Sequence, residues 1–507
     1  MKILWFGDIG RPTSFSRISE SVIPHLNSAT RSDEGYGGAV STRSDEGYGG
    51  AVSTRSDEGY GGAVSCYILA PPRSLIKSVD ALRHATKVYH VGDPIPSIGM
   101  TWELFSALDT ASPYPSTQSV DAVQSTVLSL KMKYALLQAI QYSKDENIDY
   151  IIFVIGIYEA DWFMNLYNNA RLTQVLPKVI VWTPLDYKPS YKVVENICKA
   201  DMLFTMTNSG MESIQSSIAS ALASRTTANI YVVPHAVSKC FYKIPRRKAY
   251  KYLKPVIKTL NKDDLIILNA NNYVDRKQIH LTIEAFAAVK GSQPERSSAA
   301  TEGRKFAREP LGSQTKPTGT KLWLHTNTKN PEFIRMLEYY RKKFNFSEDE
   351  IILTMNDASE EMLNNIYNFC QIGLQTSWGE GWSLTNCEHA ITGAIQVVPD
   401  FLATGEHFRR TGYAYQVGEK EYINEAGHTV TIADIKLENV VQSLIDAVQN
   451  ANSASKVPSA ALPYRREASK DRRFASKDTA LPYTAEPYLR GFTWEAIANQ
   501  IKDLIVM

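Results

Sequence analysis

The sequence predicts an α/β protein built from two doubly wound domains that face each other across a cleft, with low-complexity disordered insertions. Three observations lead to this prediction. Short apolar runs alternate with amphipathic stretches along most of the chain, as in parallel sheets covered by helices. The 507 residues are several times the usual size of a domain. A Lys/Arg-rich run at 239–255 interrupts the alternation and divides the apolar runs into two groups.

The apolar runs are predicted to be buried strands, because each is short and bounded by polar or turn residues. The first group is KILWFG (2–7), CYILAP (66–71), YIIFVIG (150–156), KVIVWTP (178–184), MLFTMT (202–207) and IYVVPH (230–235). The second group is LIILNAN (265–271), KLWLHTN (321–327), EIILTM (350–355), IGLQTS (372–377) and IQVVPD (395–400). Helices are predicted at 131–143, 210–222, 280–289, 331–343 and 359–368.

Three low-complexity segments stand between these elements. Residues 30–65 are three identical copies of TRSDEGYGGAVS, and 291–320 and 453–490 are similarly polar. Such segments bury too little apolar surface to offset the entropy of ordering, so we predict disordered surface insertions. The predicted organisation is a first domain at 1–240, a linker at 241–260, a second domain at 261–490 and a C-terminal helix at 491–507.

The composition narrows the function classes. Hydrophobic residues at 44% and charged residues at 21% are typical of a globular protein. A net charge of +2 gives no case for a nucleic-acid or acidic-lipid partner. The five cysteines include no C-x-x-C pair, which argues against structural zinc and favours a reducing, cytoplasmic compartment. The most apolar run, at 150–158, is shorter than the roughly 20 residues of a membrane span, so we expect at most peripheral membrane contact.

Ligands of doubly wound domains bind beyond the carboxyl ends of the strands, so charged residues there are candidates for a site. Arg276 and Lys277 follow LIILNAN, where a planar fork and a compact charge suit a diphosphate; an exposed pair at a helix start is the alternative. Asp186 follows KVIVWTP and could accept a proton from an acceptor or orient a sugar, or merely begin a turn. His235 is expected to be a structural, hydrogen-bonded histidine.

The stretch TSWGEGWSLTNCEHA (376–390) carries two glutamates eight positions apart. Glu380 lies between Gly379 and Gly381, which would let the backbone approach a ligand closely. An unbroken helix would separate the two carboxylates by about 12 Å, whereas a loop that folds back could aim both at one ligand.

Ser383 or Thr385 is expected to cap a helix that carries Glu388 in its first turn. The helix dipole would favour an ionised carboxylate there, able to accept hydrogen bonds from sugar or ribose hydroxyls. Routine stabilisation of the helix start is one alternative. Another is that Glu380 and Glu388 form the acid pair of a glycoside hydrolase, although the nearby cations fit a phosphate better than a neutral sugar chain.

Three segments together resemble the carboxyl-terminal half of the GT-B glycosyltransferases, specifically family 4. They are NANNYVDRKQIHLTIEAF, SEEMLNNIYNFCQIGLQTSWGEGWSLTNCEHAITGAIQVV and FTWEAIANQI. The family's hallmark is a glutamate, seven residues and a second glutamate, here EGWSLTNCE (380–388). GDIGRPTSFSRISESVIPHL and YVVPHAV resemble the amino-terminal half more loosely. The resemblance implies GT-B architecture, with a Rossmann-like acceptor-side domain followed by a Rossmann-like nucleotide-sugar domain.

The resemblance also implies roles for the matching residues. Lys277 and Arg276 would meet the diphosphate of a UDP- or GDP-sugar. Glu388 would bind the ribose hydroxyls, and Glu380 would contact and orient the transferred sugar. Further donor contacts are implied for Gly381, for the backbone amides of Trp382, Ser383 and Leu384, and for Gly10.

The implied activity is that of a retaining hexosyltransferase acting on a hydroxyl of a carbohydrate, lipid or protein acceptor. No metal site and no cofactor beyond the nucleotide-sugar are expected, because the chain lacks a D-x-D run and cations can stabilise the leaving diphosphate. The family usually has an arginine where this chain has Asn272, so either Arg276 takes over its role or the stabilisation of the diphosphate is weaker. A non-catalytic nucleotide-sugar-binding scaffold is therefore one alternative, and a GT-B sugar-nucleotide epimerase is another.

Overall fold

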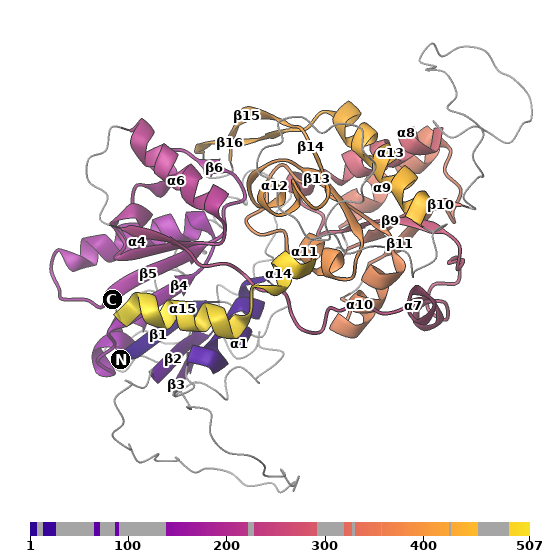
Figure 1. The fold of residues 1–507 in the computed structure, drawn as a ribbon. Coiled ribbons are helices and arrows are strands. Elements are labelled where there is room, and N and C mark those ends of the chain that lie inside the picture. The colour runs from indigo at the N-terminus through magenta and orange to yellow at the C-terminus, as the bar shows by residue number, and fades with distance from the viewer. Residues whose placement is uncertain are drawn as a thin grey trace, which may run out of the picture.

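The computed structural model describes residues 1–7, 14–26, 65–70, 87–90, 138–221, 228–291, 319–326, 330–355, 357–424, 427–454 and 486–506. Figure 1 shows two α/β units, each built on its own parallel sheet, with helices packed against it. Most of the three predicted insertions, at 30–65, 291–320 and 453–490, lies outside the described residues, and so does Gly10.

The first sheet has seven parallel strands in the order β3-β2-β1-β4-β5-β7-β8. Its strands are β1 (Lys2–Gly7), β2 (Ser65–Ala70), β3 (Lys87–His90), β4 (Tyr150–Val154), β5 (Lys178–Thr183), β7 (Met202–Thr205) and β8 (Asn229–Val232). The helices of this domain include α1 (Ser14–Leu26), α4 (Ile157–Arg171), α5 (Tyr191–Val194) and α6 (Asn208–Ser220), and residues 138–145 are helical as well. The strand order reverses between β1 and β4, so the crevice of this sheet lies there.

The second sheet has six parallel strands in the order β11-β10-β9-β12-β13-β14. They are β9 (Leu265–Ala270), β10 (Thr320–His325), β11 (Ile351–Thr354), β12 (Ile372–Leu374), β13 (Ile395–Pro399) and β14 (Tyr413–Tyr415). The helices are α8 (Ile279–Gly291), α9 (Pro331–Phe344), α10 (Glu360–Phe369), α11 (Leu384–Ile391), α12 (Leu402–Phe408) and α13 (Leu437–Ala454). Here the order reverses between β9 and β12, whose ends carry the predicted site.

Each of the predicted strands is a strand of one of these two sheets. Sequence reasoning missed β3 and β14, which are only four and three residues long. It also missed a third, antiparallel sheet in the order β15-β16-β6, formed by β15 (Gly418–Ile423), β16 (Thr429–Asp434) and β6 (Lys188–Pro189). The β15–β16 hairpin of the second domain thus pairs with a segment of the first domain, and Lys188 forms an ion pair with Glu419 across it.

Residues 241–260, predicted to be a linker, fold onto the second domain. They include helix α7 (Arg246–Leu253), whose side chains Ala249 and Leu253 are buried. Ile257 and Leu260 join them in a cluster that also contains residues of β9, β10 and α10. Ala249 and Leu253 are four positions apart and therefore share one face of α7, whereas Ile257 and Leu260 lie beyond its end. Arg247, Lys248 and Lys251 of the same helix are exposed.

The carboxyl-terminal segment returns to the first domain. Helix α15 (Trp494–Val506) packs against α1, as Figure 1 shows. Tyr150 of β4 donates a hydrogen bond to the carbonyl of Ile505 at 3.1 Å. The short helix α14 (Glu486–Arg490) lies within the predicted third insertion and buries Leu489. Among the described helices, none has the length and apolarity needed to span a bilayer.

Candidate active site

The predicted site residues of the second domain lie on two loops at one edge of its sheet. The first loop follows β9 and contains a short 3-10 helix, Asp275–Lys277. The second follows β12 and runs through 375–383 to α11. Because β9 and β12 are parallel neighbours, their carboxyl ends lie together, and the backbone amide of Trp378 donates to the carbonyl of Arg276 at 2.9 Å. The sheet topology therefore brings the cations and Glu380 together.

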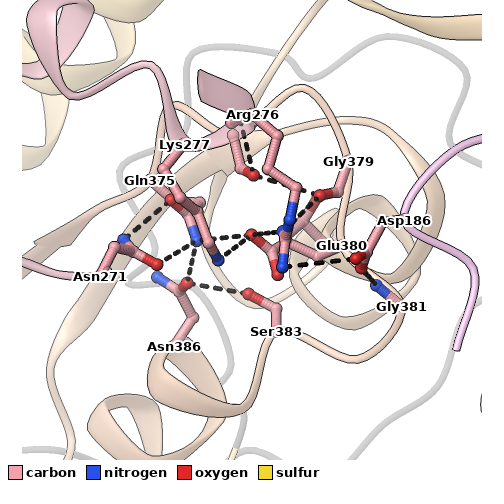
Figure 2. A network of polar contacts seen from close by, with 12 residues as sticks. Asp186, Asn271, Arg276, Lys277, Gln375, Gly379, Glu380, Gly381, Ser383 and Asn386 are labelled. Carbon is pink, nitrogen blue, oxygen red and sulfur yellow. Dashed lines mark hydrogen bonds and ion pairs between the residues drawn. The ribbon is translucent and has the colours of Figure 1, made fainter. Parts of the chain in front are cut away.

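Glu380 is the centre of a buried ionic network, drawn in Figure 2. The Lys277 ammonium group donates to Glu380 Oε1, and the Arg276 guanidinium lies 3.0 Å from the same oxygen. Arg276 also reaches Asp186 of the first domain, with 3.3 Å between Nη2 and Oδ2. Glu380 is 5% exposed and Lys277 9%. Asp186 is thus brought into the site, and Arg276 is shared between two carboxylates.

The charges of this network hold Glu380 ionised. Burial alone would raise the pKa of its carboxyl, but the charges of Arg276 and Lys277 lower that pKa to about 2. Burial and the neighbouring Arg276 charge lower the pKa of the Lys277 ammonium group. Burial also opposes the charge of Arg276, yet Asp186 and Glu380 raise its pKa. The site therefore carries two positive and two negative charges that balance one another.

The glycines of the motif serve contact between the domains. A Cβ on Gly379 would overlap the carbonyl oxygen of Asp186, and one on Gly381 would overlap Pro184. The backbone amide of Gly381 donates to Asp186 Oδ1 at 2.8 Å. The sequence predicted that these glycines admit a ligand; here they admit the first-domain segment 184–186.

Glu388 lies in a second cluster, apart from the Glu380 network. Its side chain is 1% exposed, accepts from the Tyr367 hydroxyl at 3.0 Å, and forms an ion pair with Arg17 of α1. Helix α11 begins at Leu384, so Glu388 lies beyond its first turn, where the predicted dipole effect is weaker. Burial raises the pKa of Glu388 above its ordinary value, and the Arg17 charge only partly opposes this. The expectation that the dipole would favour ionisation is thus corrected.

Polar side chains connect the motif internally. The Gln375 amide lies 3.3 Å from Glu380 Oε1 and 3.2 Å from Asn386 Oδ1. Ser383 is the N-cap of α11, in a left-handed conformation with φ of 64°, and its hydroxyl donates to Asn386 at 2.8 Å. The cap prediction for Ser383 is confirmed as to position, although its side chain bonds Asn386 instead of a backbone amide. Leu384 is the first residue of α11, where backbone amides lack intrahelical acceptors.

The aromatic and histidine side chains near the motif pack against one another. Trp382 is buried, with its ring 6.1 Å from that of His235 and 4.4 Å from that of His407. His235 is itself buried, and its Nδ1 lies 2.6 Å from the carbonyl of Ala236, in line with the structural role expected of it.

Asn272, which stands where an arginine was expected, is exposed, and no side-chain hydrogen bond of Asn272 is found among the described residues. Its neighbour Asn271 is the inward residue, and its amide donates to Asn269 at 2.7 Å and Gln375 at 3.1 Å. A cavity of about 10 Å³, room for one water molecule, is lined in part by Asn271 and Asn386.

Sequence reasoning missed four residues of the two clusters: Arg17, Tyr367, Gln375 and Asn386. Gln375 follows directly after a predicted strand, so its position was a usable signal. Arg17 lies 371 positions from Glu388 in sequence, so only the tertiary structure brings it there, whereas Tyr367 lies on α10, the helix before the motif. No cluster of three or more His, Cys, Asp or Glu side chains arranged for a metal ion occurs in the part of the chain that the structure describes.

Comparison with solved structures finds this two-sheet arrangement in glycosyltransferases. Sucrose-phosphate synthase from Thermosynechococcus elongatus superimposes with a TM-score of 0.59 at 11% identity, over 100% of this chain and 98% of that chain. HepE from Anabaena, in complex with UDP and glucose, superimposes with a TM-score of 0.55 at 10% identity, over 100% of this chain and 99% of that chain. A glycosyltransferase from Rickettsia africae ESF-5 superimposes with a TM-score of 0.54 at 12% identity, over 99% of this chain and 97% of that chain.

The fold is GT-B. At these identities the likeness concerns the fold, and the predicted fold class is confirmed. No family model matches the chain, and no curated protein matches it in sequence.

Proposed function

We propose that this protein is a retaining, metal-independent glycosyltransferase of the family 4 type, which transfers a hexose from a UDP- or GDP-sugar to an acceptor hydroxyl. The observation that carries the proposal is the buried Glu380 held between Lys277 and Arg276 at the carboxyl edge of the second sheet. The GT-B fold and the complex of the similar HepE with UDP and glucose support a nucleotide-sugar donor.

The charge balance of the network suggests how a donor enters. The donor's diphosphate would replace the carboxylates of Glu380 and Asp186 around the Arg276 guanidinium, which is 31% exposed on its side chain and can bind phosphate oxygens in pairs. Glu380, released from Arg276, keeps the Lys277 ammonium group as the partner that holds it ionised, and accepts hydrogen bonds from hydroxyls of the sugar. The exchange leaves neither the cations nor Glu380 as an isolated buried charge, which would be costly.

The same cations serve the chemical step. Cleavage of the bond between sugar and phosphate puts negative charge on the leaving diphosphate and positive character on the anomeric carbon. Lys277 and Arg276 stabilise the diphosphate in place, and one such donor typically contributes about 3 kcal/mol. Asp186, on the side of the first domain, is positioned to orient the sugar or take the proton of the acceptor hydroxyl.

Glu388 is assigned to the ribose. Both of its carboxylate oxygens have protein partners, Tyr367 and Arg17, in this structure. A ribose hydroxyl would therefore share Glu388 with Tyr367 and displace Arg17, which lies on the first domain. Donor binding and the contact between domains are thus coupled through one carboxylate.

The exposed Asn272 favours a second candidate, a protein that binds nucleotide-sugars without turning them over. The test is a panel of UDP- and GDP-sugars, first by calorimetry and then with carbohydrate, lipid and peptide acceptors in the presence of a chelator. NMR of the product should show the anomeric configuration of the donor. Tight binding with no turnover on any acceptor supports the scaffold instead, and an isomer formed from donor alone indicates an epimerase.

A further inference from the structure

The segment 239–262 is the most unevenly charged part of the chain. It contains nine Lys and Arg residues and neither Asp nor Glu. Since the whole chain has a net charge of +2, the remaining residues together carry −7. The small net charge therefore conceals a strong local asymmetry, which is typical of proteins that bind an anionic surface.

Most of these charges are exposed, and three of them, Arg247, Lys248 and Lys251, lie together on helix α7. Seven of the nine cations are exposed, and we call them, with three exposed neighbours, the basic face. Its cations are Lys239, Lys243, Arg247, Lys248, Lys251, Lys258 and Lys262, and its other members are Tyr242, Tyr252 and Val256. The cations of the basic face form no ion pair with any of the described residues. In Figure 1, helix α7 lies at the outer end of the second domain, far from the first sheet.

The basic face is held rigidly. The two remaining cations anchor it from beneath: the Arg246 guanidinium donates to the carbonyl of Phe369 at 3.0 Å and stacks on that ring, and Lys254 donates to the carbonyl of Leu260 at 2.7 Å. Ala249 and Leu253 are buried on the inner side of α7. Acidic side chains lie at both ends of the segment: Glu360 of α10 is beside Cys240, and Asp263 and Asp264 act on Arg246. Between these ends, Arg247, Lys248 and Lys251 of α7 are exposed and have no ion-pair partner among the described residues.

We propose that the basic face docks on a bilayer surface that contains anionic phospholipid. Six of its seven cations are lysines, which act as point charges in a diffuse field, whereas specific nucleic-acid recognition relies on the bidentate fork of arginine. Between the lysines, Tyr242 is 49% exposed, Tyr252 39% and Val256 67%. Tyrosine side chains are enriched at the membrane–water interface, where an apolar ring and a polar hydroxyl are both accommodated.

The experiment is co-sedimentation of the full chain with vesicles of phosphatidylcholine alone or with 30% phosphatidylglycerol. The wild type should bind only the anionic vesicles and lose binding as salt rises from about 0.1 to 0.5 M, because salt screens exposed charges. Arg247→Ala, Lys248→Ala and Lys251→Ala combined should weaken partitioning about a hundredfold, at about 1 kcal/mol for each cation.

A matched control removes three exposed cations elsewhere, Lys192, Arg335 and Lys342, and should change partitioning less than threefold. Circular dichroism and nucleotide-sugar affinity in solution should be unchanged in both triple variants, because none of the six residues belongs to the candidate site. Equal binding to both vesicle types, or equal loss in the two variants, overturns the proposal. The proposal is also overturned if the wild type binds RNA or duplex DNA but not vesicles, and the basic-face variant loses that nucleic-acid binding.

Discussion

Lys277→Met tests the ionic network most directly, because it removes one charge and keeps the length of the side chain. Glu380 would stay buried with Arg276 as its remaining cation. In the wild type, Arg276 and Lys277 together lower the pKa of Glu380 from its ordinary 4.5 to about 2, which corresponds to roughly 3 kcal/mol of stability at neutral pH for the whole network. Lys277 supplies part of this, and burial of its own charge opposes the gain, so a loss of up to about 3 kcal/mol is expected.

The stability contribution of Glu380 depends on pH in a direction that its pKa shift determines. A carboxyl whose folded pKa is lowered stabilises the protein above its unfolded pKa, and this contribution is lost as pH falls from 4.5 towards 2. In the variant, one of the two charges that oppose the effect of burial is missing, so the pKa of Glu380 rises. Glu380 is then protonated at a higher pH, and protonation removes its buried charge. The stability difference between wild type and variant should therefore be largest above about pH 5 and shrink at lower pH.

Calorimetry of both proteins between pH 4 and 7 measures this difference. A loss of 3 kcal/mol in a domain of this size lowers Tm by roughly 6–12 °C. Lys290→Met, which removes an exposed partner of Glu350, is the control and should cost less than about 1 kcal/mol. Adding Glu380→Gln to Lys277→Met should recover part of the loss, because no uncompensated charge remains. An unchanged Tm at pH 7, or a deficit that grows in acid, refutes the reasoning.

Four further outcomes are expected. Glu380→Gln should lower kcat at least about a hundredfold with little change in donor affinity; a near-normal kcat contradicts the site. Gly381→Ala should separate the domains, because its Cβ meets the first-domain loop, and small-angle scattering should show a larger radius of gyration. Arg17→Ala should further raise the pKa of Glu388, so its Tm deficit should be greater at pH 7 than at pH 5; a pH-independent deficit counts against the ion pair. Excision of 30–64, which ends just before β2, should leave turnover within about twofold, and an unfolded product contradicts the predicted insertion.

The predicted strands are confirmed where the local sequence pattern allows only one structure. Runs such as YIIFVIG and LIILNAN are apolar on both faces, and a strand of that kind has no stable place except inside a covered parallel sheet. The strands of the third sheet have no such apolar pattern and were not predicted. GEKEYI of β15 is almost wholly exposed, and β6 has only two residues, so neither carries a pattern that distinguishes it from a loop.

The interpretation of 241–260 as a linker shows a different limit. Its lysines indicated a solvated segment, yet its alanine and leucine recur with helical spacing and are buried against α10. Average charge and average hydropathy cannot reveal such a helix, because its two faces cancel. The same averaging hid the basic face behind a net charge of +2.

The sequence by itself determined the two groups of buried strands and the ends of β9 and β12 on which Lys277 and Glu380 lie. These follow from local periodicity and from the rule that parallel neighbours end at the same edge. Only the tertiary structure decided that Asp186 reaches Arg276, that Arg17 reaches Glu388, and that glycines of the motif receive a loop of the first domain. Those contacts join residues more than 80 positions apart, and they depend on how two separately folded sheets pack, which no local pattern encodes.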